Sequence, residues 1–479
     1  MAVSTATPRR QRFDVVTALT VFVFALVAIP SRLIVAPLGS AGTPAEIICI
    51  GLLGAWLIRT LNATGLPPAP RQPVRIMMWL FVGAVLLSYI AANLRSMLPV
   101  EARAADAGLL LVASWLGILL IAMDGIASRE RLNTLLRRLV CAAGALATLG
   151  LLQFVTKTSF TNLIQIPGLA THDAPVGLGD RNGLTRPSGT ALHPIEFGAV
   201  LTMCLPFALH YALADAHRSR LRRWYPVAAI AAAVPVSISR SAVLSAAVVL
   251  CVLLPTWSRG VRRRAYAAIL ALGAGAYISV PGLLSTLAGL FTGISQDSSA
   301  ASRTDSFALA FQFIGRAPIF GRGFQTFLPQ YRILDDQYLG LLIDTGVVGL
   351  GCLLGLLAIG VTGALGIWRR ERVGRDAELG VAFAASIASA LASFAVFDAF
   401  SFPMTTSLLF FVLGSYGALR RLRAVPDGSR SVSEAASPRP SAQLIARTRR
   451  LGRGNTRLTR PSRLMVNMRL IHWTRPTHR

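Results

Sequence analysis

The stretch Gln337–Val361, "QYLGLLIDTGVVGLGCLLGLLAIGV", decides the class of fold. It holds one charged side chain, that of Asp344, within a run of apolar and small residues. About 20 such residues in helical conformation cross a hydrocarbon core of about 30 Å. We therefore interpret this stretch as a membrane-spanning helix. Two adjacent acids, Asp335 and Asp336, immediately precede this stretch.

Comparable apolar runs recur along all but the last part of the chain. The 479 residues are 53% hydrophobic and only 14% charged, whereas a soluble protein carries about a quarter charged residues. The pattern predicts an all-α fold, a polytopic membrane helical bundle of about 12 transmembrane helices. The predicted spans are 14–31, 44–61, 75–92, 107–123, 134–155, 193–214, 224–239, 240–256, 265–281, 337–361, 377–397 and 402–419.

The positive charge of the chain, +27, is distributed as an orientation signal. Fifteen arginines and two acids fall from Arg420 onward, and most other arginines fill alternate short connections between the spans. Such alternation marks the cytoplasmic side and attracts anionic membrane lipids. It predicts a multi-pass protein of the cell (inner or plasma) membrane with cytoplasmic N- and C-termini, and it argues against nucleic acid as a partner.

The same pattern divides the chain into three parts. Residues 1–13 form a cytoplasmic N-terminus, 14–419 a membrane domain, and 420–479 a basic tail with too few apolar residues for a core, so we expect disorder there. Two long outer segments, about 156–192 and 282–336, interrupt the membrane domain and show no clear helical stripe. These segments hold arginines on the outer side, where the orientation signal disfavours them, and Arg240 lies in a further tight outer turn. The arginines of the two segments are Arg181, Arg186, Arg303, Arg316, Arg322 and Arg332.

No motif of the chain indicates a metal site. The five cysteines lie singly in apolar runs, and His172 and Asp173 lack the spacing of metal ligands. The sequence therefore predicts neither a metal ion nor a cofactor.

Four stretches resemble a known family. "RPSGTALHPIEFGAVL" from Arg186, "ISRSAVLSAAVVL", "RTDSFALAFQFIGRAPIFGRGFQTF" and "LDDQYLGLLIDTGVVGL" occur in the order expected for the O-antigen ligase/polymerase superfamily. The resemblance implies a helical bundle with partly helical outer loops that acts as an inverting, metal-independent membrane glycosyltransferase. Its substrate would be a polyprenyl-diphosphate-linked oligosaccharide at the outer face, and other polysaccharide-assembly proteins are expected partners.

The leaving diphosphate in such a reaction calls for guanidinium groups, which pair with phosphate oxygens and keep their charge. By resemblance, Arg186 and Arg303 match the two arginines that the family uses on the diphosphate, and Arg240 is a third candidate. The alternative for each outer arginine is contact with lipid headgroups or pairing with an acid.

The acceptor hydroxyl needs a group that takes its proton. Ligases of the family place a histidine before this span, whereas the present chain has Asp335 and Asp336 there. A carboxylate serves as general base when its surroundings raise its pKa, so Asp335, Asp336 and Arg303 are the candidate catalytic residues. The alternative for either aspartate is an N-cap of the following helix.

Several other residues have two interpretations. His193 is either a substrate-binding group or a structural residue at a helix start, and Glu196 one turn later is expected to pair with an arginine. Gly321 and Gly323 predict a turn, either an ordinary one or one where backbone approaches a ligand. Asp344 is suspect as an intramembrane acid, although Gly346 indicates a loosened helix that could satisfy it locally.

The leading hypothesis is polymerisation of polyprenyl-diphosphate-linked oligosaccharide units into an exopolysaccharide or O-antigen-like glycan. Transfer of a finished glycan by an O-antigen ligase is the near alternative. A polysaccharide-precursor transporter, or flippase, is the rival from another class. Transporters carry their polar groups at the bilayer midplane, whereas the unusual residues here gather in two outer segments.

Overall fold

The computed structural model of the protein describes residues 14–62, 72–171, 178–292, 298–372 and 374–424, with side chains except those of 298–306. The chain divides into two compact units, Met1–Ala424 and Val425–Arg479. The second unit and residues 1–13 lie outside the described residues, as do His172 and Asp173.

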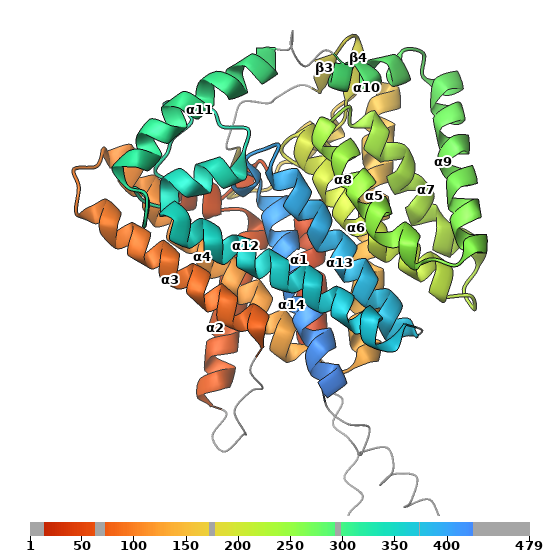
Figure 1. Ribbon diagram of the computed structural model, residues 1–479, viewed down its shortest axis with the longest axis horizontal. Helices are drawn as coiled ribbons and strands as arrows, with labels where there is room; N and C mark the ends of the chain where they lie inside the picture. Colours follow the sequence, from red (N-terminus) through yellow and green to blue (C-terminus); the bar gives the residue numbers. More distant parts are fainter. Residues whose placement is uncertain (1–13, 63–71, 172–177, 293–297, 373, 425–479) are drawn as a thin grey trace, which may run out of the picture. The chain divides into compact units, whose positions relative to one another are not determined.

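The first unit is a helical bundle, which confirms the all-α prediction (Figure 1). Each of the twelve predicted spans coincides with a helix. These are α1 (Val15–Ala28), α2 (Pro44–Leu61), α3 (Pro73–Asn93), α4 (Pro99–Gly125), α5 (Arg129–Thr156), α6 (Pro194–Ala214), α7 (Arg220–Val236), α8 (Arg240–Leu253), α9 (Arg259–Ser279), α12 (Gln337–Glu371), α13 (Arg375–Phe394) and α14 (Pro403–Ala424).

Seven helices of the described chain are long and apolar enough to cross a membrane, namely α2, α3, α4, α5, α6, α12 and α13. An eighth span results if α9 and α10 (Leu283–Thr292), bent by 110°, are taken together. These helices make the protein polytopic, and the count of about twelve crossings stays a prediction for the remaining helices.

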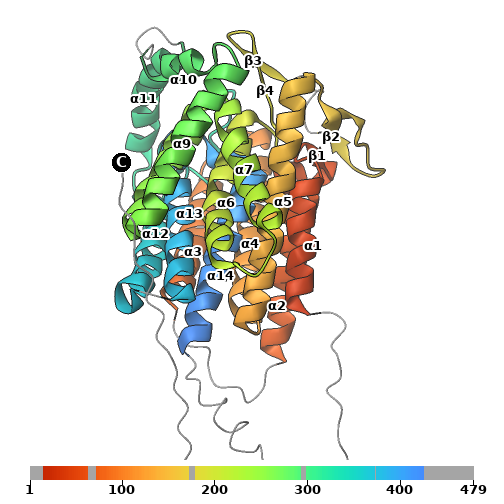
Figure 2. The ribbon, with the colours of Figure 1, turned by 90° about the vertical axis from the view of Figure 1, so that its right-hand side faces the viewer.

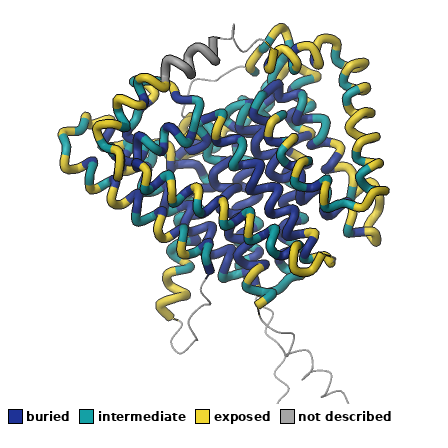
Figure 3. The backbone as a smooth tube through the Cα atoms, viewed as in Figure 1, coloured by how far each residue is buried: buried dark blue, intermediate teal, exposed yellow. Residues whose placement is uncertain are grey.

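The core of the bundle lies where α4, α6, α13 and α14 pack together. Figure 3 shows the centre of the bundle as its most buried part. Trp115 of α4 stacks on Phe410 of α14, with ring centroids 5.0 Å apart, and lies 4.7 Å from the ring of Phe400. Since Phe400 belongs to a short 3-10 helix, Ala399–Ser401, between α13 and α14, aromatic packing fixes this connection to the core.

Both predicted outer segments lie at one end of the bundle, which we call the hairpin end (Figures 1 and 2). The first contains the 3-10 helix Phe160–Leu163, β2 (Ala170–Thr171), which pairs with β1 (Leu33–Ile34), and the hairpin of β3 (Gly179–Arg181) and β4 (Leu184–Arg186). The second contains α10 and α11 (Ser298–Arg316).

The helices of the second segment correct the expectation that it has no helical stripe. Ala310, Phe313 and Ile314 of α11 pack against Leu339 and Ile343 of α12. Their spacing is that of one helix face, so the stripe exists but is confined to the last turns of α11.

Candidate functional site

Arg186 is held at the hairpin end by a tight turn. Asn182 and Gly183 have φ of 54° and 76°, as a type I′ turn requires, and this places Arg186 opposite Gly179 in the β3–β4 register. The half-buried guanidinium makes one long hydrogen bond, from Nε to the carbonyl oxygen of Ser237 at 3.4 Å. Burial, with a smaller contribution from the charge of Arg181, lowers its pKa to about 10. Within the described chain, no carboxylate pairs with this cation.

His193 is the N-cap of α6, which supports its structural interpretation. Its Nδ1 accepts a hydrogen bond from the backbone N–H of Ile195 at 3.2 Å, so the proton of the neutral ring is on Nε2. Burial, with a contribution from the charge of Arg186, lowers the pKa of His193 to about 4. The ring is therefore neutral at physiological pH and lies close to Arg186.

The other two candidate arginines, Arg240 and Arg303, are located by their helices. Arg240 is the first residue of α8, three residues after Ser237, the residue that Arg186 contacts. Arg186 and His193 thus lie close together at the start of α6, and Arg240 follows the α7–α8 turn that Arg186 contacts. Arg303 belongs to α11 at the same end, but its side chain lies outside the described residues.

The two aspartates before α12 have different surroundings. Asp336 is the N-cap of α12, and its Oδ1 accepts the N–H of Tyr338 at 2.9 Å and that of Leu339 at 3.2 Å. Asp335 is half-buried and lies close enough to Asp398 to raise the pKa of that acid. Burial is the main cause of the increase, to about 6, against a hydrogen bond from Ser401. The capping interpretation therefore holds for Asp336, and Asp335 belongs to a pair of acids.

Asp344 lies at a break in α12 that the segment 317–327 fills. Gly346 has φ 64° and ψ −167°, a region that only glycine adopts readily. The carbonyl groups of residues 343 and 344 accept the N–H groups of Arg322 and Gly323, at 3.1 and 3.0 Å. In return, the N–H groups of residues 347 and 348 donate to the carbonyls of Pro318 and Ile319, at 2.9 and 3.3 Å.

The side chain of Asp344 completes this exchange. Its two oxygens accept the backbone N–H groups of Gln325 and Phe327, at 2.8 and 3.1 Å. The local satisfaction expected from Gly346 is thus confirmed. Gly321, at φ 70°, also lies against the backbone of Asp344, so the close approach at Gly321 and Gly323 is to α12.

Gly346→Ala is expected to lower the free energy of unfolding by about 2–4 kcal/mol, because a Cβ there meets the carbonyl oxygen of Ile319 and forces an unfavourable φ. Gly351→Ala is the matched control, since it lies in the same helix with open space around it and should change stability by less than about 1 kcal/mol. Thermal unfolding of both variants in detergent micelles provides the measurement. Equal effects of the two substitutions would contradict the break.

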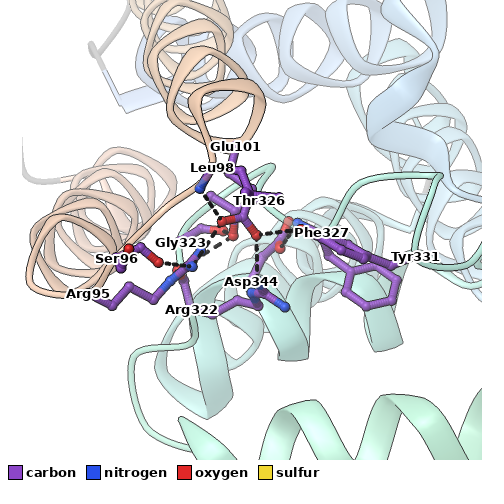
Figure 4. A network of polar contacts seen from close by, with 10 residues as sticks. All are labelled: Arg95, Ser96, Leu98, Glu101, Arg322, Gly323, Thr326, Phe327, Tyr331 and Asp344. Carbon is purple, nitrogen blue, oxygen red and sulfur yellow. Dashed lines mark hydrogen bonds and ion pairs between the residues drawn. The ribbon is translucent and has the colours of Figure 1, made fainter.

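Sequence reasoning missed Glu101, which gathers four donors on one buried carboxylate (Figure 4). Its oxygens accept Arg322 at 2.5 Å, Arg95 at 2.9 Å, the hydroxyl of Tyr331 at 3.0 Å and the N–H of Leu98 at 3.2 Å. Arg322 therefore follows the alternative of pairing with an acid, which it shares with Arg95.

A local signal for Glu101 was present in the sequence. Three helices that start at the hairpin end begin with proline and carry glutamate two residues later: Pro44 and Glu46, Pro99 and Glu101, Pro194 and Glu196. All three glutamates are buried. Glu196 accepts the backbone N–H groups of Leu192 and Met404, each at 2.7 Å, so the expected arginine partner of Glu196 was wrong.

The helical spans, the arginines of the hairpin end and the buried acids at helix starts describe a polytopic membrane protein with polar groups gathered at the hairpin end. Residues 225–354 match the family model described as O-Antigen ligase. This match supports the resemblance of the chain to the O-antigen ligase/polymerase superfamily, whose members assemble glycans from lipid-linked sugars. No curated protein matches the chain.

The matched region runs from α7 into α12. It includes Arg240, Arg303, Asp335 and Asp336 and leaves Arg186 outside. Among the described residues, no group of three histidine, cysteine, aspartate or glutamate side chains is arranged to hold a metal ion.

Proposed function

We propose that the protein polymerises polyprenyl-diphosphate-linked oligosaccharide units into an exopolysaccharide or O-antigen-like glycan at the outer face of the membrane. The observation that carries the proposal is the environment of Arg186. A half-buried guanidinium beside a second arginine, with no carboxylate partner in the described chain, is costly unless an anion completes it. A diphosphate supplies that anion.

The donor diphosphate would be bound by Arg186, Arg240 and Arg303, with Nε2–H of neutral His193 as a further donor. As the bond between the anomeric carbon and the phosphate oxygen breaks, negative charge builds on the leaving diphosphate. Positioned cations stabilise that charge by about 3–4 kcal/mol each. The requirement accounts for arginines on the side of the membrane where orientation disfavours them.

The acceptor hydroxyl would transfer its proton to Asp335 while its oxygen attacks the anomeric carbon. This single displacement inverts the configuration and needs no metal. Asp335 is assigned the role because it takes the position of the histidine in ligases of the superfamily, whereas Asp336 is the N-cap of α12. The neighbouring acid Asp398 lies close enough to Asp335 for the two carboxylates to interact.

A carboxylate at the position where ligases of the superfamily have histidine favours polymerisation over ligation. Chain growth also suits this site, because the acceptor hydroxyl belongs to the same kind of lipid-linked unit as the donor. Both substrates then approach the hairpin end from the membrane.

A deletion strain provides the test, with the length distribution of its glycan as the readout. We expect long polymer to disappear and single lipid-linked units to accumulate at the outer face, and the wild-type gene to restore the polymer. Polymer of normal length that is no longer attached to its acceptor would instead identify a ligase. Units trapped at the cytoplasmic face would identify a flippase and overturn the proposal.

A further inference from the structure

We infer that Glu101 is a positioning residue for glycan transfer, which clamps the segment between α11 and α12 so that both of its ends hold their place. The inference rests on the proposed function for its consequence in catalysis. It concerns a residue of α4, outside the region that matches the family.

The clamp grips Arg322 at both its side chain and its backbone (Figure 4). The guanidinium donates to Glu101 at 2.5 Å, while Nε of Arg95 donates to the carbonyl oxygen of Arg322 at 3.0 Å. Since Arg95 also donates to Glu101, at 2.9 Å, the three residues form a closed ring of contacts. Tyr331 adds its hydroxyl to the same carboxylate, which fixes the segment at a second point nine residues later.

The segment needs such a clamp because its own backbone is strained. Gly321, Gly323 and Gln325 have φ of 70°, 126° and 65°, and a positive φ at Gln325 costs about 1 kcal/mol or more. Asp344 holds the far side of the segment through its bonds to Gln325 and Phe327. Glu101 from α4 and Asp344 from α12 therefore hold opposite sides of one strained turn.

The clamp extends to both ends of the segment. At the α11 end, the guanidinium carbon of Arg322 lies 4.7 Å from the ring centroid of Phe313 and 5.4 Å from that of Tyr331. Phe313 is ten residues from Arg303 on the same helix, about 15 Å along its axis. At the α12 end, Tyr331 is four residues before Asp335. Movement of Arg322 would thus displace the proposed diphosphate ligand and the proposed base together.

Glu101→Gln removes the charge but keeps the size of the side chain. Asp124→Asn is the matched control, because Asp124 lies at the opposite end of the same helix and pairs with Arg75 and the indole N–H of Trp56. Tyr331→Phe is a milder second variant that deletes one hydroxyl and leaves the packing. Each variant is made in the full chain with a nitroxide label on Gln330→Cys, an exposed position. Cys141→Ala and Cys251→Ala remove the two exposed native cysteines, which would otherwise take up the label.

Two readouts separate positioning from folding. Electron paramagnetic resonance in nanodiscs reports the motion of the label at position 330. Steady-state kinetics use the lipid-linked oligosaccharide extracted from the deletion strain. We expect Glu101→Gln to speed label motion and lower kcat about 10–100-fold, as misplacement of about 1 Å does, with KM changed less than threefold. Tyr331→Phe should give smaller changes in the same direction, and Asp124→Asn should give neither.

Three results would overturn the clamp: unchanged label motion in Glu101→Gln, faster motion without loss of kcat, or an equal loss of kcat in Asp124→Asn. The proposed function fails separately. If the wild-type protein does not lengthen the extracted oligosaccharide, polymerisation is rejected, and the label motion still decides whether Glu101 orders the segment.

Discussion

Asp335→Asn is expected to lower the rate of glycan polymerisation by about 10²–10⁴-fold, the range for loss of a general base. Asparagine keeps the size of the side chain and its capacity to accept hydrogen bonds, but it cannot take the proton of the acceptor hydroxyl. Because Asp335 lies close to Asp398, removing its charge should lower the repulsion between the two acids. The measurement is glycan chain length in the complemented deletion strain, with membrane levels of the variant checked.

Asp336→Asn is the matched control for this prediction. Asparagine and aspartate are about equally good N-caps, so the bonds to Tyr338 and Leu339 should survive and polymer length should stay near that of the wild type. If Asp336→Asn abolishes polymer and Asp335→Asn does not, the two aspartates have the opposite roles. Normal polymer with both variants would remove this pair from the chemistry.

Hydropathy located a helix at each predicted span, because an apolar run of this length has few alternatives to a helix in a membrane. The ends of the helices were less predictable. The α4 helix begins at Pro99, before the predicted 107, and α12 continues to Glu371, beyond 361. Polar residues extend both helices, since helical hydrogen bonds do not stop where hydrophobicity does.

The features of the candidate site also differ in how far they could be predicted from the sequence. Features set by neighbours in sequence were predictable, such as the N-cap at Asp336 and the loosened helix at Gly346. Contacts between distant segments were not. Arg322 and Glu101 are 221 residues apart, and Asp335 meets Asp398 only because α12 and α13 pack together. Only the repeated proline and glutamate at helix starts indicated that Glu101 is buried.

Arg186→Ala is expected to lower the rate of glycan transfer by about 10²–10³-fold, through loss of about 3–4 kcal/mol of stabilisation of the leaving diphosphate. The rate of the Arg186→Lys variant should fall between those of the wild type and the alanine variant, because an ammonium keeps the charge but not the planar pair of donors. Both are measured with extracted lipid-linked oligosaccharide in nanodiscs. The bond from Arg186 to Ser237 is long, so little stability depends on this side chain.

Stability therefore distinguishes an anion-binding Arg186 from a structural one. Removing a half-buried cation beside Arg181 relieves repulsion, so the alanine variant should unfold at the same temperature as the wild type or higher while losing activity. Arg32→Ala is the contrasting case at the hairpin end, because Arg32 donates to Asn162 at 2.5 Å and to the carbonyl of Thr161 at 2.8 Å. It should lose about 1–3 kcal/mol of stability and keep transfer. Reversal of these two patterns would place Arg186 in the scaffold and leave the diphosphate without its principal ligand.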